Sequence, residues 1–178
     1  MTDAKRGYPD LHEHLKTLKQ RGLLRTIAER IDKDSELHPL VRWQFVGGMD
    51  EGERKAFLFT NIVDGRGRKY KIPVVVGAIA ANRAIYSAGM GVPLEKIQAK
   101  WDHAIAHPIA PRVVTKAVCH EVVLKGAALK GEGHGLDMLP IPISTPGFDS
   151  APTLTATNVI TRDPDTGVQN MGTYRAAL

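Results

Sequence analysis

The feature that most restricts the folds open to this chain is a β-hairpin signature near its carboxyl end. Two alternating runs, TLTATNVIT and VQNMGTYRA, flank the stretch RDPDTG. Asp-Pro followed by a closing Gly is typical of a chain reversal, and Thr-rich alternation is typical of paired strands. The sequence therefore predicts an antiparallel hairpin over residues 153–176.

The residues before position 108 follow a different pattern, in which helix and strand signals alternate. Leu11, Leu15 and Leu18 form an apolar stripe that ends at Gly22, which predicts a first helix. The runs AFLFTNI and PVVVGAI predict buried strands joined through the turn DGRGRK. This alternation is typical of an α/β region.

A second helix is predicted from the run PLEKIQAKWDHAIAH. Pro93 is favourable in a first helical turn, and Pro108 stops the helix. Between them, Ile97, Trp101 and Ile105 recur every four residues, which indicates one apolar helix face.

After this helix the sequence changes to short strand-like runs. AVCHEVVL is predicted as a strand, and the Gly- and Pro-rich connection KGEGHGLDMLPIPISTPGFDSAP separates it from the hairpin. Cys119 lies in that strand pattern with Val118 and Val122, so we expect it in the core. Such short runs are typical of a β barrel or sandwich, and the chain as a whole is predicted to be α+β.

Composition and charge further limit the classes of fold and function that are open to the chain. The chain has 178 residues, 43% of them hydrophobic, which is enough for one sizeable core or two small ones. Its 24 Lys and Arg against 19 Asp and Glu give a net charge of +5, which suits phosphate or carboxylate ligands and also nucleic acid. The single cysteine excludes an internal disulfide. No signal-peptide core or membrane-length apolar run is present, so we expect a cytoplasmic protein without a membrane partner.

The returning strand of the hairpin carries the candidate site residues Asn170 and Arg175. Five residues of extended chain separate them by about 16 Å, a span comparable with an extended mononucleotide cofactor. Strict alternation puts their side chains on opposite faces, so a bulge or sharp twist at Gly172 is required if both serve one ligand. On the residues alone, an exposed hairpin with a solvated Asn and Arg is the favoured interpretation.

Three segments together resemble a known family: DLHEHLKTLKQRGLL, HPIAPRVV and LPIPISTPGFDSAPTLTATNVITRDPDTGVQNMGTYR. They resemble the amino-terminal part of the UbiD-type decarboxylases, relatives of the polyprenyl-hydroxybenzoate decarboxylases that use prenylated FMN. The resemblance covers almost the whole chain, and QNMGTYR is its most specific element. It implies a carboxy-lyase that reversibly decarboxylates an aromatic or α,β-unsaturated carboxylic acid.

The resemblance also implies a role for residues of that element. Asn170 matches the family's Asn that ligates a divalent metal, usually Mn²⁺, which bridges to the flavin phosphate. Thr173, Tyr174 and Arg175 match the cofactor-binding triplet, and Arg175 matches the catalytic Arg beside the flavin and the substrate carboxylate. The implied cofactors are prenylated FMN and Mn²⁺ or a similar divalent metal, with K⁺ as a further candidate.

The family fold implies an amino-terminal α/β domain over residues 1–112 and the first part of a split β-barrel that binds prenylated FMN over residues 113–178. Family members are more than twice as long, and their second metal ligand and catalytic acid lie beyond the position of Leu178. We therefore expect the remainder of the enzyme or a second subunit as a partner, within a homo-oligomer. The 178 residues alone are expected not to decarboxylate a substrate.

Four other candidate sites have simpler interpretations. His103 and His107 lie four residues apart, but no third ligand accompanies them, which favours helix-end histidines. The run HEVVL lacks the second His of a zinc-protease motif and indicates a strand. GEGHG has no strand-to-helix context for phosphate binding, and GRGRK has no interleaved aromatic residues for nucleic acid. A loop and a solvated hairpin tip are the favoured interpretations of these two runs.

The sequence leaves three functions open, ranked in the following order. The first is a prenylated-flavin carboxy-lyase, and the second is a non-catalytic flavin-binding subunit or scaffold completed by a partner chain. The third is a basic nucleic-acid-binding module. A yellow or orange chromophore with bound manganese supports the first two, whereas salt-dependent nucleic-acid binding without a chromophore supports the third.

Overall fold

The computed structural model describes residues 10–178. The first nine residues, MTDAKRGYP, on which the absence of a signal-peptide core was predicted, lie outside the described residues. The chain forms two compact units, each built from several segments. The first comprises the described residues up to Ile27 with Gly48–Leu58 and Val75–Met138. The second comprises Ala28–Gly47, Phe59–Val74 and Leu139–Leu178. The predicted domain boundary after residue 112 stays a prediction.

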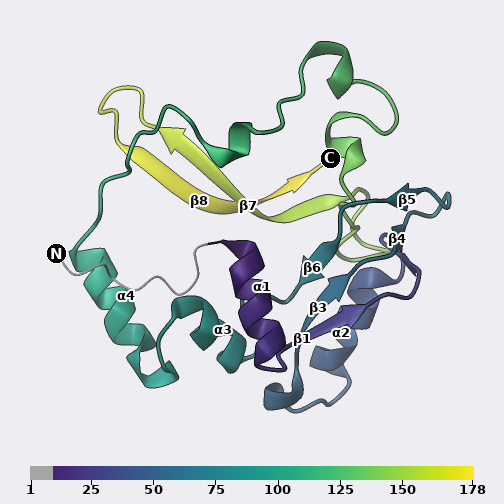
Figure 1. The fold of residues 1–178 in the computed structure, drawn as a ribbon, viewed down its shortest axis with the longest axis horizontal. Helices are drawn as coiled ribbons and strands as arrows, with labels where there is room; N and C mark the ends of the chain where they lie inside the picture. Colours follow the sequence, from purple (N-terminus) through teal and green to yellow (C-terminus); the bar gives the residue numbers. More distant parts are fainter. Residues whose placement is uncertain (1–9) are drawn as a thin grey trace. The chain divides into compact units, whose positions relative to one another are not determined.

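The first unit combines helices with a small sheet (Figure 1). Its α-helices are α1 (Leu11–Gln20), α3 (Arg83–Met90) and α4 (Ile97–Ala106). Its sheet, which belongs mainly to this unit, has the strand order β1 (Leu24–Ile27), β3 (Ala56–Phe59) and β6 (Val74–Val76). The predicted runs AFLFTNI and PVVVGAI thus contain neighbouring strands, as expected from their apolar character.

The first predicted helix is confirmed as α1, and its ends have clear local causes. The Asp10 side chain accepts a hydrogen bond from the Glu13 backbone N–H at 2.9 Å, which caps the amino end. Gly22 adopts a positive φ of 68° after the last turn, and the Leu23 N–H donates to the Leu18 carbonyl at 2.8 Å. Leu18, from the predicted apolar stripe, is fully buried.

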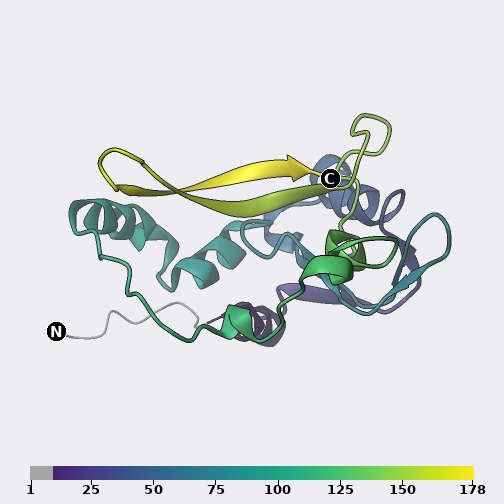
Figure 2. The ribbon, with the colours of Figure 1, turned by 90° about the horizontal axis from the view of Figure 1, so that it is seen from above.

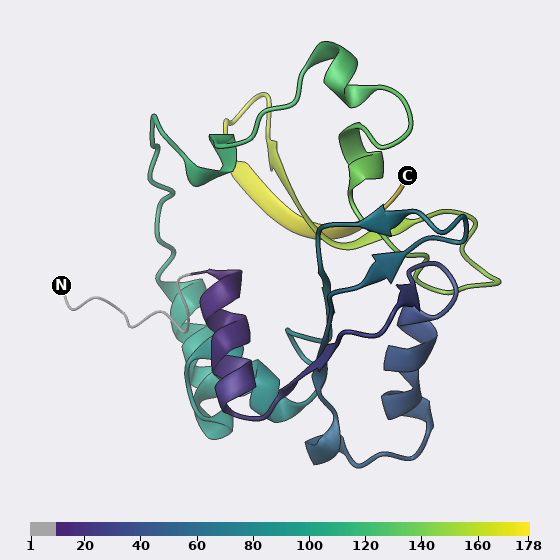
Figure 3. The same cartoon turned by 45° about the vertical axis from the view of Figure 1, so that its right-hand side comes forward.

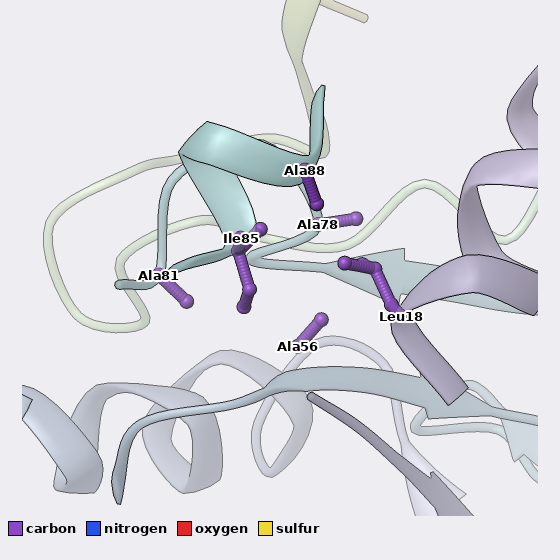
Figure 4. Packing of buried hydrophobic residues seen from close by; sticks show 6 residues of the cluster. All are labelled: Leu18, Ala56, Ala78, Ala81, Ile85 and Ala88. Atoms are coloured by element: carbon purple, nitrogen blue, oxygen red, sulfur yellow. The ribbon is translucent and has the colours of Figure 1, made fainter. Parts of the chain in front are cut away.

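One cluster of buried apolar side chains joins α1, α3 and the sheet of the first unit (Figure 4). The cluster consists of Leu18, Ala56, Ala78, Ala81, Ile85 and Ala88. Polar contacts fix the same elements, because the Asn82 side chain accepts from the Ile85 N–H at 2.7 Å and donates to the Arg54 carbonyl at 2.6 Å. Small alanines let helix and sheet backbones approach closely, so the larger Ile85 and Leu18 fill the remaining space.

Ile85 is, with Leu18, one of the two large side chains of this cluster, and both are fully buried. Ile85→Ala is expected to lower the free energy of unfolding by about 2–4 kcal/mol, because it removes buried methylene groups and leaves a cavity. Urea denaturation of the purified protein measures this loss. Ile105→Ala on α4 is the matched control, since Ile105 is 75% exposed and its loss should change stability by about 0.5 kcal/mol or less. Equal effects of the two substitutions would contradict the assigned core.

The second predicted helix is also confirmed, as a 3-10 turn over Leu94–Lys96 followed by α4. The apolar stripe that predicted it is largely exposed, with Trp101 and Ile105 both accessible to solvent. The Trp101 indole N–H donates to the Tyr86 hydroxyl at 3.0 Å. Periodicity therefore predicted the helix correctly without predicting burial of its apolar face.

The connection that follows α4 differs from the prediction. Residues 107–138 form an irregular path with short helical turns (Figure 3). The predicted strand AVCHEVVL is wrong, since Val118–His120 form a 3-10 turn and Cys119 is exposed and not in the core. A strand needs a neighbour to satisfy its backbone groups, and no strand of residues 10–178 pairs with this run.

The second unit contains one α-helix among the described residues, α2 (Leu37–Val46), and two small sheets. In one sheet β2 (Ile31–Asp32) pairs in parallel with β4 (Ile62–Val63), and β4 pairs antiparallel with β5 (Lys69–Tyr70). The predicted turn DGRGRK closes this β4–β5 pair, with the Asp64 carboxylate accepting backbone N–H groups within the turn. The other sheet is the carboxy-terminal hairpin.

A buried lysine ties the start of that hairpin to the rest of the second unit. The Lys33 ammonium donates to the Asp34 carboxylate at 2.6 Å and to the Ile141 carbonyl at 3.0 Å. One residue further on, the Pro142 carbonyl accepts from the Thr153 N–H at 3.0 Å. Lys33 thereby fixes the segment against which the first strand of the hairpin begins.

The architecture confirms a mixed α+β chain with small sheets. The hairpin is a two-stranded sheet within the described residues, so the split barrel stays a prediction. Nowhere between residues 10 and 178 does a helix have the length and apolar character needed to cross a bilayer.

Candidate functional site

The structure confirms the predicted hairpin, which carries all four predicted site residues. Strands β7 (Thr153–Arg162) and β8 (Gln169–Ala177) pair antiparallel from Arg162 opposite Gln169 to Thr153 opposite Ala177. Figure 2 shows them as a long, twisted two-stranded ribbon. Asn170, Thr173, Tyr174 and Arg175 all lie on β8.

The turn between the strands is held by the Asp163 carboxylate. One of its oxygens accepts hydrogen bonds from the backbone N–H groups of Asp165 and Thr166, at 3.0 and 2.6 Å. The hydrogen bonds from the Thr166 backbone and hydroxyl lower the pKa of the Asp163 carboxyl. Gly167 closes the turn with a φ of 71°. This local chemistry sets the register in which β8 returns.

The register determines which faces of β8 the four residues occupy. The cross-strand partners are Thr161 for Asn170, Asn158 for Thr173 and Thr157 for Tyr174. Successive side chains of a strand point to opposite faces, so Asn170 and Tyr174 share one face while Thr173 and Arg175 share the other. The Thr173 hydroxyl donates to the Asn158 side chain at 3.2 Å. The structure thus brings the four residues onto one strand but divides them between its faces.

The bulge or sharp twist at Gly172 that a single ligand shared by Asn170 and Arg175 would require is absent from the hairpin. Gly172 stands in regular register opposite Val159, and the register shift lies in β7 between Leu154 and Thr157. Two residues of β7 there oppose Arg175 alone, which is the pattern of a bulge. A bulge on the opposing strand increases the local twist beside Arg175.

Gly172 has a different role, which is to make room for an aromatic ring. A Cβ atom at Gly172 would lie 2.5 Å from the Tyr174 ring, so any side chain there would displace Tyr174. The ring therefore lies over Gly172. Asn170 and Tyr174 share one face of β8 by alternation, so an amide oxygen and an aromatic ring are on the same side of the strand.

Arg175 forms an ion pair with Asp149, a residue that was not predicted from the sequence as part of the site. One guanidinium nitrogen, Nη2, lies 3.2 Å from each carboxylate oxygen of Asp149. The Arg175 side chain is 58% exposed and the Asp149 side chain 25% exposed. Solvent screens a pair of this exposure, so its contribution is to orientation more than to stability.

The carboxylate of Asp149 is itself held by its loop. It accepts the backbone N–H of Thr145 at 2.8 Å, while the Asp149 N–H donates to the Thr145 carbonyl at 2.9 Å. Gly147, inside this loop, has a φ of 89°, a conformation that favours glycine. Asp149 and Arg175 are 26 residues apart in the chain, so no spacing rule could have linked them.

A histidine of α2 lies within the electric field of the same carboxylate. Burial lowers the pKa of His38, and the negative charge of Asp149 opposes that shift. His38 therefore reports on the charge of Asp149 in a way that can be measured.

The described residues contain no preformed cluster of metal ligands. Between residues 10 and 178, no three His, Cys, Asp or Glu side chains come together as a metal site. Asn170 is exposed and offers one neutral carbonyl oxygen, a donor that suits a hard divalent cation. It fits one coordination position, and a cation with six or more oxygen ligands needs further donors.

The remaining candidate runs of the sequence lie in simple local structures. His103 and His107 stack at a ring distance of 4.3 Å at the carboxyl end of α4, as expected of helix-end histidines. The GEGHG run follows the 3-10 turn Gly126–Leu129, and its last residue, Gly135, begins the 3-10 turn Gly135–Met138, with no strand of the described residues leading into it. GRGRK forms the β4–β5 turn.

Comparison with known proteins gives two kinds of match. Residues 112–178 match a family model, UbiD, described as the 3-octaprenyl-4-hydroxybenzoate carboxy-lyase Rift-related domain. The whole fold is similar to the UbiD-class enzyme HmfF from Pelotomaculum thermopropionicum in complex with FMN, with 31% identity and a TM-score of 0.75. That similarity covers 93% of this chain and 33% of HmfF.

Two further solved structures extend this similarity. An evolved dimeric form of HmfF in complex with prFMN is 29% identical, with a TM-score of 0.68, over 93% of this chain and 35% of its own. The vanillic acid decarboxylase of Sedimentibacter hydroxybenzoicus in its open form shares the fold at 22% identity, with a TM-score of 0.73, over 96% and 34%. The chain therefore spans about a third of the length of the structures it matches.

Proposed function

The chain is related to the UbiD family through its Rift-related domain, and from this relationship we propose that it is part of a prenylated-FMN-dependent carboxy-lyase. The observation that carries the proposal is that the matched segment, residues 112–178, contains the whole β7–β8 hairpin with Asn170 and Arg175. The proposed reaction is the reversible decarboxylation of an aromatic or α,β-unsaturated carboxylic acid.

We assign prenylated FMN as the cofactor because the two similar HmfF structures hold FMN and prFMN. When bound, such a cofactor supplies the electron sink that is needed to break a carbon–carboxylate bond. The donor set of β8 fits a flavin nucleotide, since an amide oxygen and an aromatic ring share one face. Asn170 and Tyr174 on that face, together with Thr173 on the other face, are the proposed binding residues.

The metal proposal rests on the chemistry of Asn170. Its side-chain oxygen suits Mn²⁺ or a similar divalent cation beside a flavin phosphate, with K⁺ as a further candidate ion. Phosphate carries negative charge that a hard cation neutralises, so loss of the cation should weaken binding of the nucleotide as well.

Arg175 is the proposed catalytic residue. Its guanidinium carries a permanent charge and can hold a carboxylate by two parallel hydrogen bonds. Its side chain is 58% exposed, so a ligand has access to the group. Arg175 would bind the substrate carboxylate and keep it in register with the reacting carbon.

The proposal covers an assembly larger than the described chain. Residues 1–112 are assigned to an amino-terminal α/β domain and residues 113–178 to the first part of a split β-barrel, completed by the remainder of the enzyme or a second subunit. The exposed hairpin supports this assignment, because a two-stranded sheet is marginally stable without further strands. A homo-oligomer is proposed as its assembled state.

The test is a reconstitution of the full enzyme that contains these residues. The protein is loaded with prenylated FMN and Mn²⁺, and carbon dioxide release is followed with a panel of aryl and alkenyl carboxylic acids. We expect a flavin absorbance that stays with the protein and release from at least one acid. Failure to retain flavin would overturn the proposal, and flavin retention without turnover of any acid would favour a non-catalytic flavin-binding subunit.

A further inference from the structure

We propose that Asp149 is the positioning residue of Arg175, which fixes one edge of the guanidinium and leaves the other edge to a substrate carboxylate. This inference rests on the proposed function, because it takes Arg175 as the group that binds the substrate. It concerns a residue of the 145–149 loop, outside the strand that carries the predicted site.

The geometry of the Asp149–Arg175 ion pair leaves part of the guanidinium available to a second ligand. Asp149 engages Arg175 through Nη2 alone, with both carboxylate oxygens at 3.2 Å from that nitrogen. A guanidinium has five N–H donors in a planar fork, so Nη1 and Nε keep donors directed away from this contact. A second carboxylate can therefore be bound by Arg175 while Asp149 stays in place.

Asp149 is held in place more firmly than Arg175. Its carboxylate accepts the Thr145 N–H, and its own N–H returns to the Thr145 carbonyl, so the side chain is fixed to a closed loop. Arg175 has long, flexible methylene links and is 58% exposed. The fixed carboxylate of Asp149 therefore orients the guanidinium of Arg175. Without Asp149, Arg175 would lose rotamer freedom each time it binds a ligand, which would weaken binding.

The position of the bulge adds a third observation. Two residues of β7 oppose Arg175 alone, so the strand twists at the position from which the side chain leaves. The backbone and Asp149 together thus set the direction of one side chain. Asn170 and Thr173 stand in regular cross-strand pairs, so no bulge lies opposite either of them.

The test compares Asp149→Asn with Asp165→Asn in the full enzyme. Asp149→Asn keeps a side-chain oxygen that can accept the Thr145 N–H but removes the charge, whereas Asp165 is an exposed acid of the hairpin turn and serves as the matched control. Benzoate is the probe, and its dissociation constant is measured by calorimetry. We expect Asp149→Asn to weaken benzoate binding about threefold to tenfold, in line with a partly screened ion pair, and Asp165→Asn to leave it unchanged.

A double variant separates positioning from a merely structural role, and a second measurement checks the change of charge at Asp149. In an Arg175→Ala background, Asp149→Asn should add no further loss of benzoate affinity, because residues that act through one another are not additive. An NMR titration should show a lower pKa for His38 in Asp149→Asn, since the charge that opposes its downward shift is gone. Asp149→Glu, which restores the charge, should recover part of the affinity and return the pKa of His38 towards its original value.

The outcomes distinguish this inference from the proposed function. If Arg175→Ala weakens benzoate binding and Asp149→Asn does not, the positioning role is wrong and the role of Arg175 stands. If Arg175→Ala binds benzoate as the wild type does, the proposed function of Arg175 fails and the inference fails with it. Additive losses of benzoate affinity in the double variant would overturn the inference alone.

Discussion

Arg175→Ala is expected to lower the turnover of the full enzyme by about 10²–10³-fold, the usual cost of removing a charged group that stabilises the transition state. The substrate carboxylate loses its cationic partner and its orientation relative to the reacting carbon. Retention of the flavin should fall much less, because the Asn170 end of β8 is unchanged. Steady-state carbon dioxide release and bound-flavin absorbance, measured on the same sample, give both quantities.

Arg175→Lys sharpens this expectation, because it keeps the charge and removes the planar fork. A lysine ammonium cannot hold Asp149 on one edge and a second carboxylate on the other, so the loss of turnover should approach that of Arg175→Ala. Arg162→Lys is the matched control, since Arg162 is exposed on the same hairpin and donates to the Gly167 carbonyl near the turn. Near-normal turnover of Arg175→Lys would mean that Arg175 acts only as a general positive charge or as a structural residue.

The second large effect is expected for Asn170→Ala, which removes a neutral oxygen from the proposed metal site. Loss of one direct ligand should weaken binding of Mn²⁺ by about 100-fold, the upper end of what outer ligand-shell substitutions cost. Flavin should be lost together with the metal, since the cation neutralises the phosphate. Elemental analysis for manganese and flavin absorbance of the purified protein measure the two losses.

The neighbouring residue provides the control for this substitution. Gln169 carries the same amide group one position earlier on β8, where alternation directs it to the opposite face. Its side chain accepts from the Arg162 guanidinium at 3.4 Å, a contact within the hairpin. Gln169→Ala should therefore keep normal manganese and flavin content. An unchanged manganese content in Asn170→Ala would show that Asn170 is not a ligand of the metal.

The two substitutions also test each other. Asn170→Ala should empty the cofactor site, whereas Arg175→Ala should leave it filled and inactive. The same loss pattern in both variants would mean that β8 acts as one structural unit, with no division between an anchoring end and a reactive end.

Structure that depends on neighbouring residues was predicted well from the sequence. The capped, Gly-terminated stripe of α1 and the four-residue repeat of α4 predicted helices that the structure contains. The hairpin followed from turn chemistry, since Asp163 and Gly167 fix the reversal through contacts over a few residues. The resemblance to the UbiD-type enzymes, which the family match supports, also came from consecutive residues.

Features that depend on distant partners were predicted less well. The run AVCHEVVL has the composition of a strand, yet it forms none, because strand formation requires a neighbour that the local residues do not specify. The apolar stripe of α4 marks a helix and is nevertheless exposed, because burial depends on what packs against it. The helices α2 and α3 were not identified from the sequence, although Asn82 caps α3 and Gly91 ends it.

The sequence by itself determined where the chain reverses, which residues follow one another on β8, and which family the segment resembles, because short-range geometry and turn chemistry are properties of adjacent residues. Only the tertiary structure placed the bulge opposite Arg175 instead of at Gly172, and brought Asp149 to the guanidinium. Both depend on how a loop closes against a strand 26 residues later. An ion pair acts through space, so its partner cannot be read from the order of residues along the chain.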